Sequence, residues 1–319
     1  MKIIFITGCP IKNGNGHTSR ISGLSKNLSK NNITFLYIIS SHYKSVKFIY
    51  KKYFNNYIII KNYKNIFNHK NFFGDTLIID DYQFPKSMTK LTSTKFNKLF
   101  YFKDNNIIDN KKYSGISPKL QFSRNNIIVQ NFFINPKIKI KNRINHNKKI
   151  LLSLGLGKTG NDKAILLHLL KRIDSNIVEK FIIDHTLSFN FKQLKFIEKF
   201  NNLKLVQINQ VNYMNNISNY AFSINAGGMT SLELIILRIP QITFKLSENQ
   251  NRNISFLKKI NNDCIKIIGK ISFANSNKFL KAFSFMTNNI LKNNKNIFFT
   301  NNIFLDNEAI LSKIITNDN

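Results

Sequence analysis

The chain has 319 residues, of which 43% are hydrophobic and 20% charged, so it is long enough for two domains with packed cores. Its 48 lysines and arginines outnumber its 16 acids, which gives a formal net charge of +32. The basic residues are mostly Lys and are spread along the whole length among Asn, Ile and Phe. We therefore attribute the charge to composition and expect no specific nucleic-acid partner.

The two cysteines, Cys9 and Cys264, are too few for a disulfide framework and indicate a reducing compartment. The first apolar run is too short for a signal peptide, and no apolar stretch approaches the roughly 20 residues of a membrane span. We expect a cytoplasmic protein without a transmembrane segment. No spacing of His, Cys and Asp suggests a metal site, and no cofactor is expected. The sequence does not indicate the oligomeric state.

The first half alternates short β-branched or aromatic runs with helical spacing, as is typical of parallel α/β layers. The spacing of Ile21, Leu24 and Leu28 predicts a helix directly after the first strand. Strands are predicted over Lys2–Thr7, Ile33–Ile39, Tyr57–Lys61, Thr76–Asp80, Lys98–Phe102 and Asn126–Gln130.

A polar, lysine-rich stretch, Asn135–Lys149, then predicts an inter-domain linker. After it the alternation restarts. Further strands are predicted over Ile150–Leu154, Phe181–Asp184, Leu203–Ile208, Ala221–Asn225, Gln241–Leu246 and Cys264–Ile268. Helices are predicted over Ala164–Arg172, Phe191–Phe200, Thr230–Arg238, Asn277–Leu291 and Asn307–Ile315. We therefore predict two Rossmann-like, doubly wound parallel-sheet domains, residues 1–140 and 148–319, facing a central cleft, with the last helix packing back toward the N-terminal domain.

The early turn Gly14-Asn15-Gly16-His17 follows the first strand and places His17 near the N-terminus of a helix. A histidine titrates near neutral pH and can act as a general base. The helix N-terminus would lower its pKa and favour the neutral form. His17 is our candidate catalytic residue, and a histidine without a catalytic role is the alternative.

The late segment Asn225–Thr230 contains Gly227 and Gly228 and follows another predicted strand. The glycines allow close approach of a ligand, and the next helix offers N–H groups and the positive end of its dipole to a phosphate. Glu233, one turn into that helix, can accept two ribose hydroxyls. Thr230 as N-cap with Glu233 at the third helical position also fits a capping box, and the sequence leaves both readings open.

Two further polar segments follow strands and so lie where ligands bind in doubly wound sheets. Asn249 and Gln250 carry amides suited to sugar hydroxyls, or they begin a polar helix. The run Asp80-Asp81-Tyr82 lines the cleft or ends its strand in a turn.

Together these residues resemble the GT-B glycosyltransferase-like group. More closely they resemble the UDP-sugar hydrolases of pseudaminic acid biosynthesis, the UDP-2,4-diacetamido-2,4,6-trideoxy-β-L-altropyranose hydrolases. That family carries Gly-x-Gly-His-x-x-Arg near its start, an Asp-x-Tyr-like strand end, and Ala-Gly-Gly-x-Thr-x-x-Glu, a later Pro and Asn-Gln in its second domain. The matching positions are Gly14, Gly16, His17, Arg20, Asp80, Tyr82, Ala226, Gly227, Gly228, Thr230, Glu233, Pro240, Asn249 and Gln250, with Met214 at the family's usual methionine. The chain departs from the family at Asn135–Lys149 and at Gly155-Leu156-Gly157.

The resemblance implies a GT-B fold and a UDP-sugar substrate. It assigns the nucleotide and its phosphates to Gly16, Gly227, Gly228, Met229, Thr230 and Glu233, and the sugar to Arg20, Tyr82, Asn249 and Gln250. It implies that His17 activates a water molecule that displaces UDP from the anomeric carbon. In a glycosyltransferase, the alternative, the same histidine deprotonates an acceptor hydroxyl. A sugar-nucleotide binding protein with little turnover is a third possibility.

Overall fold

The structure, a computed structural model, describes residues 1–7, 16–28, 32–39, 54, 56–81, 84–102, 113–116, 120–122, 126–129, 148–154, 160–173, 178–183, 189–201, 204–208, 219–260, 263–292, 302–305 and 314. The chain divides into two compact units. The first comprises Met1–Leu120, Ile128–Pro136 and Phe304–Asn319, and the second comprises Gln121–Ile127 and Lys137–Ile303. The predicted features at Gly14, Tyr82, 135–147, 155–157, Met214 and most of 307–315 lie outside the described residues.

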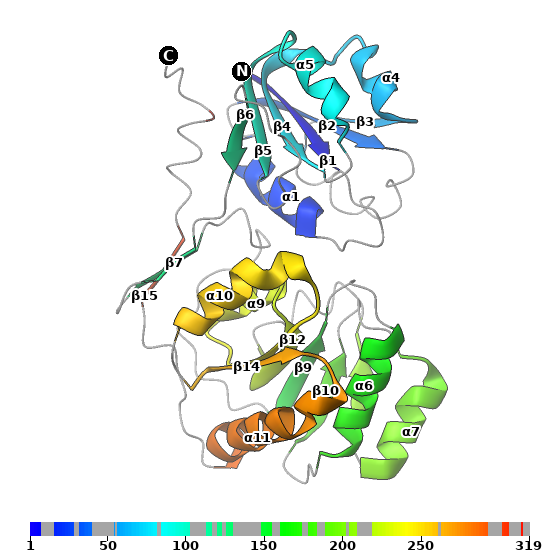
Figure 1. Cartoon of the computed structure of the whole chain (residues 1–319), viewed down its shortest axis with the longest axis vertical. Coiled ribbons are helices and arrows are strands. Elements are labelled where there is room, and N and C mark those ends of the chain that lie inside the picture. Colours follow the sequence, from blue (N-terminus) through cyan, green and yellow to red (C-terminus); the bar gives the residue numbers. More distant parts are fainter. Residues whose placement is uncertain are drawn as a thin grey trace. The chain divides into compact units, whose positions relative to one another are not determined.

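The first unit contains a sheet of six parallel strands in the order β3-β2-β1-β4-β5-β6 (Figure 1). The strands are β1 (Lys2–Thr7), β2 (Ile33–Ile39), β3 (Asn56–Ile60), β4 (Gly74–Asp80), β5 (Phe96–Phe102) and β6 (Tyr113–Ile116). The helical segments are α1 (Gly16–Leu28), α4 (Tyr63–Phe67), η3 (Lys86–Met88) and α5 (Thr89–Thr92). β1 is buried from Ile3 to Thr7, as expected of a central strand covered on both faces.

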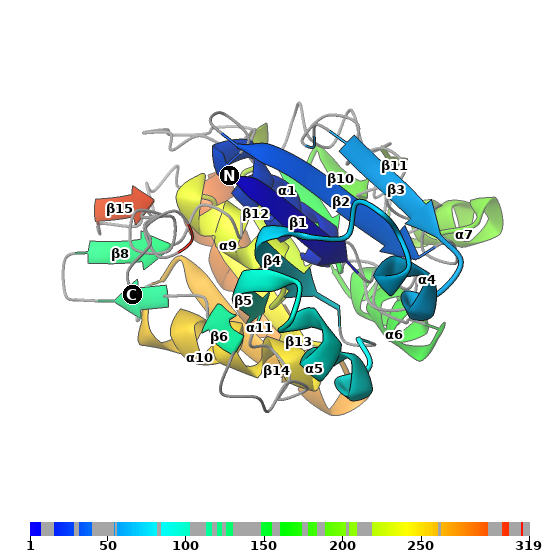
Figure 2. The ribbon, with the colours of Figure 1, turned by 90° about the horizontal axis from the view of Figure 1, so that it is seen from above.

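Helices cover both faces of this sheet: α4 and α5 lie on one side and α1 on the other (Figure 2). Tyr37, Phe72 and Phe96 form part of the core on the α4 side, where the ring of Phe72 meets those of Tyr37 and Phe96 edge-on at 5.3 and 5.1 Å. On the other side α1 buries Ile21, Leu24 and Leu28, the three residues whose spacing predicts that helix.

The second unit repeats the same arrangement with six parallel strands in the order β11-β10-β9-β12-β13-β14. The strands are β9 (Lys149–Ser153), β10 (Lys180–Ile183), β11 (Leu205–Gln207), β12 (Phe222–Ala226), β13 (Gln241–Lys245) and β14 (Ile265–Lys270). The helices are α6 (Gly160–Lys171), α7 (Phe191–Asn201), α9 (Met229–Ile236), α10 (Asn251–Lys259) and α11 (Ser276–Met286), with the shorter η6 (Glu248–Gln250) and η7 (Phe273–Asn275) and the π-helix η8 (Thr287–Lys292). Counted along each unit, both sheets have the strand order 3-2-1-4-5-6 of doubly wound dinucleotide-binding domains. The predicted pair of doubly wound parallel sheets is confirmed.

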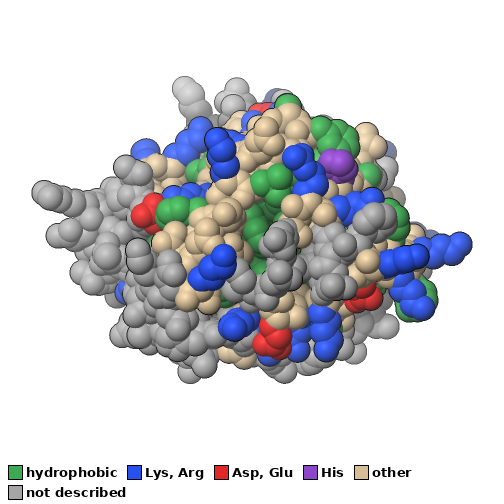
Figure 3. Space-filling view, turned by 90° about the horizontal axis from the view of Figure 1, so that it is seen from below, with side chains coloured by type: hydrophobic (Ala, Val, Ile, Leu, Met, Phe, Trp, Pro, Cys, Tyr) green, Lys and Arg blue, Asp and Glu red, His purple; other side chains and the backbone are tan. Residues whose placement is uncertain are grey.

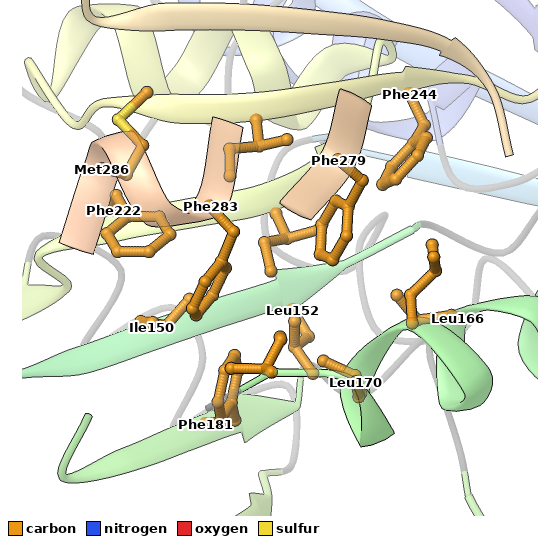
Figure 4. Close-up of a cluster of buried hydrophobic side chains, with 14 of the residues drawn as sticks. Ile150, Leu152, Leu166, Leu170, Phe181, Phe222, Phe244, Phe279, Phe283 and Met286 are labelled. Carbon is orange, nitrogen blue, oxygen red and sulfur yellow. The ribbon is translucent and has the colours of Figure 1, made fainter. Parts of the chain in front are cut away.

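An aromatic core lies between the second sheet and helices α6 and α11 (Figure 4). Phe283 of α11 packs against Phe222 of β12 and Phe181 of β10, with ring centroids 5.7 and 6.1 Å apart. Phe279, one turn earlier, packs against Phe244 of β13 at 5.7 Å. This core fixes β12 and β13, the two strands that lead into the late candidate site.

The strands at the end of the first half differ from expectation. The predicted strand Asn126–Gln130 is β8 (Asn126–Val129), and it belongs to a separate three-stranded sheet with β7 (Leu120–Phe122) and β15 (Asn302–Leu305). β6 was not predicted, because its sequence Tyr-Ser-Gly-Ile includes two residues of low strand propensity.

Candidate functional site

The second sheet changes direction between β9 and β12, which are hydrogen-bonded neighbours although they are not consecutive. The chain proceeds from β9 toward one edge of the sheet and from β12 toward the other. Ligands of doubly wound sheets bind beyond the carboxyl ends of the strands at such a point. The turn after β12, Gly227-Gly228, is at this position, and α9 begins directly after it.

Gly227 is enclosed by its neighbours. Its N–H donates to the carbonyl of Phe244 at 2.8 Å, and its carbonyl accepts from Asn253 Nδ2 at 3.1 Å. A Cβ at Gly227 would lie 2.4 Å from Cδ1 of Ile254 in α10. A larger residue here would therefore displace the Ile254 side chain, and the turn after β12 is held between β13 and α10.

Gly228 has a different environment. The atom nearest to a Cβ built there is Nε2 of Gln250, at 3.9 Å, so the space above this residue is open. Oε1 of Gln250 accepts from the N–H of Leu246 at 2.8 Å, which fixes the orientation of the amide. The structure thus brings Gly228 and Gln250, which belong to two separate sequence motifs, together around open space.

The capping-box reading of Thr230 and Glu233 is wrong. α9 begins at Met229, so Gly228 is the N-cap residue, and no side chain caps the helix. Thr230 is already inside the helix. Ser231 donates from its hydroxyl and its N–H to the carbonyl of Gly228, at 2.6 and 3.2 Å. The start of α9 is thus a helix N-terminus of the kind whose N–H groups bind anions, although the N–H of Ser231 is already used within the turn.

Glu233 lies in the second turn of α9 with only 7% of its surface exposed. A carboxylate this deeply buried needs hydrogen-bond donors or an opposite charge. Its assignment to ribose hydroxyls stays a prediction.

A buried polar network beneath α9 was missed from the sequence. Gln241 of β13 donates from Nε2 to the carbonyl of Ser231 at 3.0 Å, and its Oε1 accepts from Asn225 Nδ2 at 2.8 Å and from the Thr243 hydroxyl at 3.3 Å. Asn225 Nδ2 also donates to the Ser223 hydroxyl at 3.1 Å, while Oδ1 of Asn225 is buried without a hydrogen-bond partner among the described residues. The network attaches the first turn of α9 to β12 and β13. Its signal is the alternation of polar with apolar residues in Phe-Ser-Ile-Asn and Gln-Ile-Thr-Phe.

Charged residues lie beside this site at the end of β13. Lys245 Nζ is 2.9 Å from both carboxylate oxygens of Glu248, and Asn251 Nδ2 donates to Oε2 of Glu248 at 2.8 Å. These hydrogen bonds lower the pKa of Glu248 below its ordinary value, the one from Lys245 first. Asn249 lies in η6 between Glu248 and Gln250, and its side chain is outside the described part of the structure.

The first unit has its own change of direction, between β1 and β4. α1 follows β1 and contains Gly16 and His17; the structure describes the backbone of His17 but not its side chain. Arg20, one turn further, is buried and donates from Nε and Nη2 to the two carboxylate oxygens of Asp80 at the end of β4. The resemblance assigns Arg20 to the sugar, and the structure directs its guanidinium to Asp80.

Asp80 and Asp81 have different partners. Asp81 accepts a hydrogen bond from the hydroxyl of Tyr63 in α4, whereas Asp80 faces Arg20 of α1. Thr7, paired in register with Asp80, is fully buried, and its hydroxyl has no hydrogen-bond partner among the described residues. Within the described ranges, no group of three or more His, Cys, Asp and Glu side chains could hold a metal ion. Nor is any helix of this part of the chain long and apolar enough to cross a membrane.

No protein-family model matches the chain. An uncharacterized protein of Methanocaldococcus jannaschii is 27% identical over 293 residues, a match that covers 82% of this chain but only 59% of that protein's length.

Among solved structures, the UDP-GlcNAc 2-epimerase of Neisseria meningitidis bound to UDP-GlcNAc has a TM-score of 0.50 at 14% identity, covering 89% of this chain and 90% of that one. The Escherichia coli heptosyltransferase WaaC with ADP has a TM-score of 0.50 at 8% identity, covering 90% of this chain and all (100%) of that one. A putative UDP-N-acetylglucosamine 2-epimerase of Listeria monocytogenes has a TM-score of 0.51 at 10% identity, covering 90% and 88%. These likenesses show a GT-B fold of two parallel-sheet α/β domains.

Proposed function

We propose that the chain is a UDP-sugar hydrolase that releases UDP from an amino-sugar nucleotide in nonulosonic-acid or surface-polysaccharide biosynthesis. The observation that carries this proposal is the turn Gly227-Gly228, which leads into α9 at the point where the second sheet changes direction. The open space above Gly228 beside Gln250 supports a ligand there. Solved structures of the same fold carry UDP-GlcNAc or ADP.

In this proposal the N–H groups at the start of α9 bind the diphosphate, and Glu233 accepts the ribose hydroxyls. His17 takes a proton from a water molecule whose oxygen attacks the anomeric carbon. The bond from that carbon to the UDP oxygen breaks, and its electron pair leaves with UDP. Hydrogen-bond donors aimed at the leaving diphosphate stabilise the charge that develops on it.

The second candidate function is a glycosyltransferase, which the likeness to a heptosyltransferase favours. In that reaction His17 removes the proton of an acceptor hydroxyl instead of that of water. Both reactions act on a sugar nucleotide in the cytoplasm, and neither proposal includes a cofactor.

The deciding experiment incubates the purified chain with a panel of UDP-amino sugars and measures UDP and free sugar. A hydrolase releases both products in equal amounts without an acceptor. A glycosyltransferase shows little turnover until an acceptor alcohol is added. If UDP raises the melting temperature but no UDP-sugar is turned over, the chain is a binding protein and the hydrolase proposal fails.

A further inference from the structure

The outer side of α7 consists of phenylalanine and lysine. The exposed side chains in the described part of this helix are Phe191, Lys192, Lys195, Phe196 and Lys199. At roughly 100° per residue they occupy one continuous arc of roughly 140° around the helix. Over the same part of α7 the one acidic residue, Glu198, is half-buried, and its Oε1 accepts from the N–H of Leu205. The exposed arc therefore carries positive charge and aromatic surface without an acid.

The phenylalanines on this side are unusually open to solvent: Phe191 is 69% exposed and Phe196 is 46% exposed. Lys195 Nζ lies 4.5 Å from the ring centroid of Phe191, and Lys171 of α6 lies 4.0 Å from that of Phe196. Each ring thus has an ammonium group over one face, a cation–π contact.

The surface continues across α6. His168, one turn before Lys171, meets the ring of Phe273 edge-on at 4.9 Å, and Phe273 is 59% exposed. We call the side chains of Lys171, Phe191, Lys192, Lys195, Phe196, Lys199, His168 and Phe273 the α6–α7 surface. α7 lies at the outer margin of the second unit beside α6 (Figures 1 and 2). On the face seen from below, basic side chains outnumber acidic ones among the described residues, with hydrophobic side chains between them (Figure 3).

We propose that the α6–α7 surface binds a lipid bilayer that carries anionic headgroups. The strength of binding to a membrane surface increases with the apolar area that enters the headgroup boundary and with the attraction of basic side chains to anionic lipids, and this surface offers exposed Phe and Lys side by side. The stems of the three lysines on α7 are long enough to reach headgroups while the rings lie deeper. This surface is separate from the Gly227-Gly228 site, so the inference does not depend on the reaction catalysed.

A nucleic-acid partner fits this surface less well. Single-stranded nucleic acids bind in basic grooves and stack their bases on open ring faces. Here the side chains belong to α6, α7 and η7, and lysines cover one face of Phe191 and of Phe196. Phe191, Phe196 and Phe273 are each exposed and can enter a headgroup layer.

The experiment is flotation of the full chain with vesicles of phosphatidylcholine alone and of phosphatidylcholine with 30 mol% phosphatidylserine. We expect binding to the anionic vesicles only. The combined substitution Lys192→Gln, Lys195→Gln and Lys199→Gln should weaken binding about a hundredfold. Each lysine near an anionic surface contributes a similar share of the binding free energy, and this variant loses three such contributions. Phe191→Ser with Phe196→Ser should weaken it about tenfold or more, and the loss should persist when salt is varied.

The matched control replaces three exposed lysines elsewhere on the second unit, Lys258, Lys278 and Lys281, with Gln. It removes the same charge and should change binding less than about threefold if α7 is the contact. An equal loss in the control would show attraction by net charge alone and overturn the proposal, as would absence of binding to anionic vesicles. A 20-nucleotide single-stranded RNA is tested in parallel, and loss of RNA binding in the Phe variants with unchanged vesicle binding would also overturn it. Unchanged circular dichroism confirms that each variant is folded.

Discussion

Arg20 of α1 and Asp80 of β4 form a buried ion pair in which two nitrogens of the guanidinium meet both oxygens of the carboxylate. Their side chains are 6% and 1% exposed. The guanidinium also lies 4.6 Å from the ring centroid of Phe102 at the end of β5. The pair therefore fixes α1, the helix that contains His17, to the carboxyl ends of two strands.

Breaking this pair should destabilise the protein strongly. Asp80→Asn and Arg20→Ala each leave a buried polar or charged group without its partner, and we expect a loss of about 3–5 kcal/mol in the free energy of unfolding. Urea unfolding followed by circular dichroism measures it. Asp263→Asn is the control. The Asp263 side chain is 68% exposed, so its ion pair with Lys266 should contribute about 1 kcal/mol or less to stability. Similar losses in the buried and exposed variants would contradict the structural role given to Arg20.

His17 and Glu233 should have separable roles in the proposed reaction. His17→Ala should lower kcat by about 10²–10⁴-fold with nearly unchanged UDP affinity, because it removes a general base. Glu233→Gln should mainly weaken UDP binding, since an amide accepts hydroxyl donors less strongly than a carboxylate. Steady-state kinetics and calorimetric titration with UDP distinguish the two. Full activity in His17→Ala would contradict the mechanism.

Gly227→Ala should destabilise the turn after β12 through a clash. The new methyl group would lie 2.4 Å from Cδ1 of Ile254, and such overpacking costs about 1–3 kcal/mol. Cγ1 of Ile254 would also lie 2.8 Å from the new methyl group, so Ile254→Ala, which removes both atoms, should relieve the clash, and a double-mutant cycle of melting experiments would detect the coupling. Gly228→Ala is the control, since the space above Gly228 is open. A Gly228→Ala variant as unstable as Gly227→Ala would argue against this packing.

Gln241→Met should release the first turn of α9 from the sheet. The substitution keeps the size of the side chain but removes its bonds to Ser231, Asn225 and Thr243. We expect a loss of about 1–3 kcal/mol of stability, as for buried polar groups left unpaired. UDP affinity should fall as well, because the N–H groups of α9 lose their fixed position. Thr243→Val removes only the 3.3 Å bond and should leave UDP affinity unchanged; if both variants bind UDP normally, the network does not position α9.

The Cys264 thiol should react slowly in the folded protein. Burial, with a smaller contribution from Asp263, raises its pKa from 9.0 to about 12, so the thiolate is scarce near pH 8. In a Cys9→Ser background, a thiol reagent at pH 8 should label Cys264 at least tenfold faster in urea than in buffer. Because the folded pKa is the higher one, this group's contribution to stability is complete below pH 9.0 and decreases as the pH rises toward 12. Equal labelling rates in the two conditions would contradict the burial.

The sequence predicted the elements well where their apolar pattern is strong. β1 and β2 have the predicted bounds, and α7 begins at the predicted Phe191. Strand order was not predicted, because periodicity identifies a strand but not its neighbours. Some elements end at a different residue from the predicted one. For example, β13 ends at Lys245, one residue before its predicted end.

The sequence singled out the glycines and amides of the candidate site, whose ligand roles stay predictions, but not its supporting residues. In the structure Gln250 lies beside Gly228, although the two residues belong to separate sequence motifs. The sequence predicted that α9 begins at Thr230, with Thr230 as N-cap of a capping box as an open alternative, and the structure begins the helix at Met229 after Gly228 as N-cap. The structural role of Gln241 was not predicted, because it depends on a hydrogen-bond partner in α9 that the sequence alone does not identify.

The contact between Gly227 and Ile254 has a mechanical consequence. Asn253 Nδ2 of α10 donates to the carbonyl of Gly227 at 3.1 Å, and the Ile254 side chain packs beside the same residue, so a displacement of α10 would be felt at the turn. We expect the position of α10 to influence how far the turn can open toward a ligand. Substitutions on the solvent side of this helix, at exposed positions such as Ser255 or Lys259, offer a way to adjust ligand affinity from a distance, without altering any atom that touches the ligand.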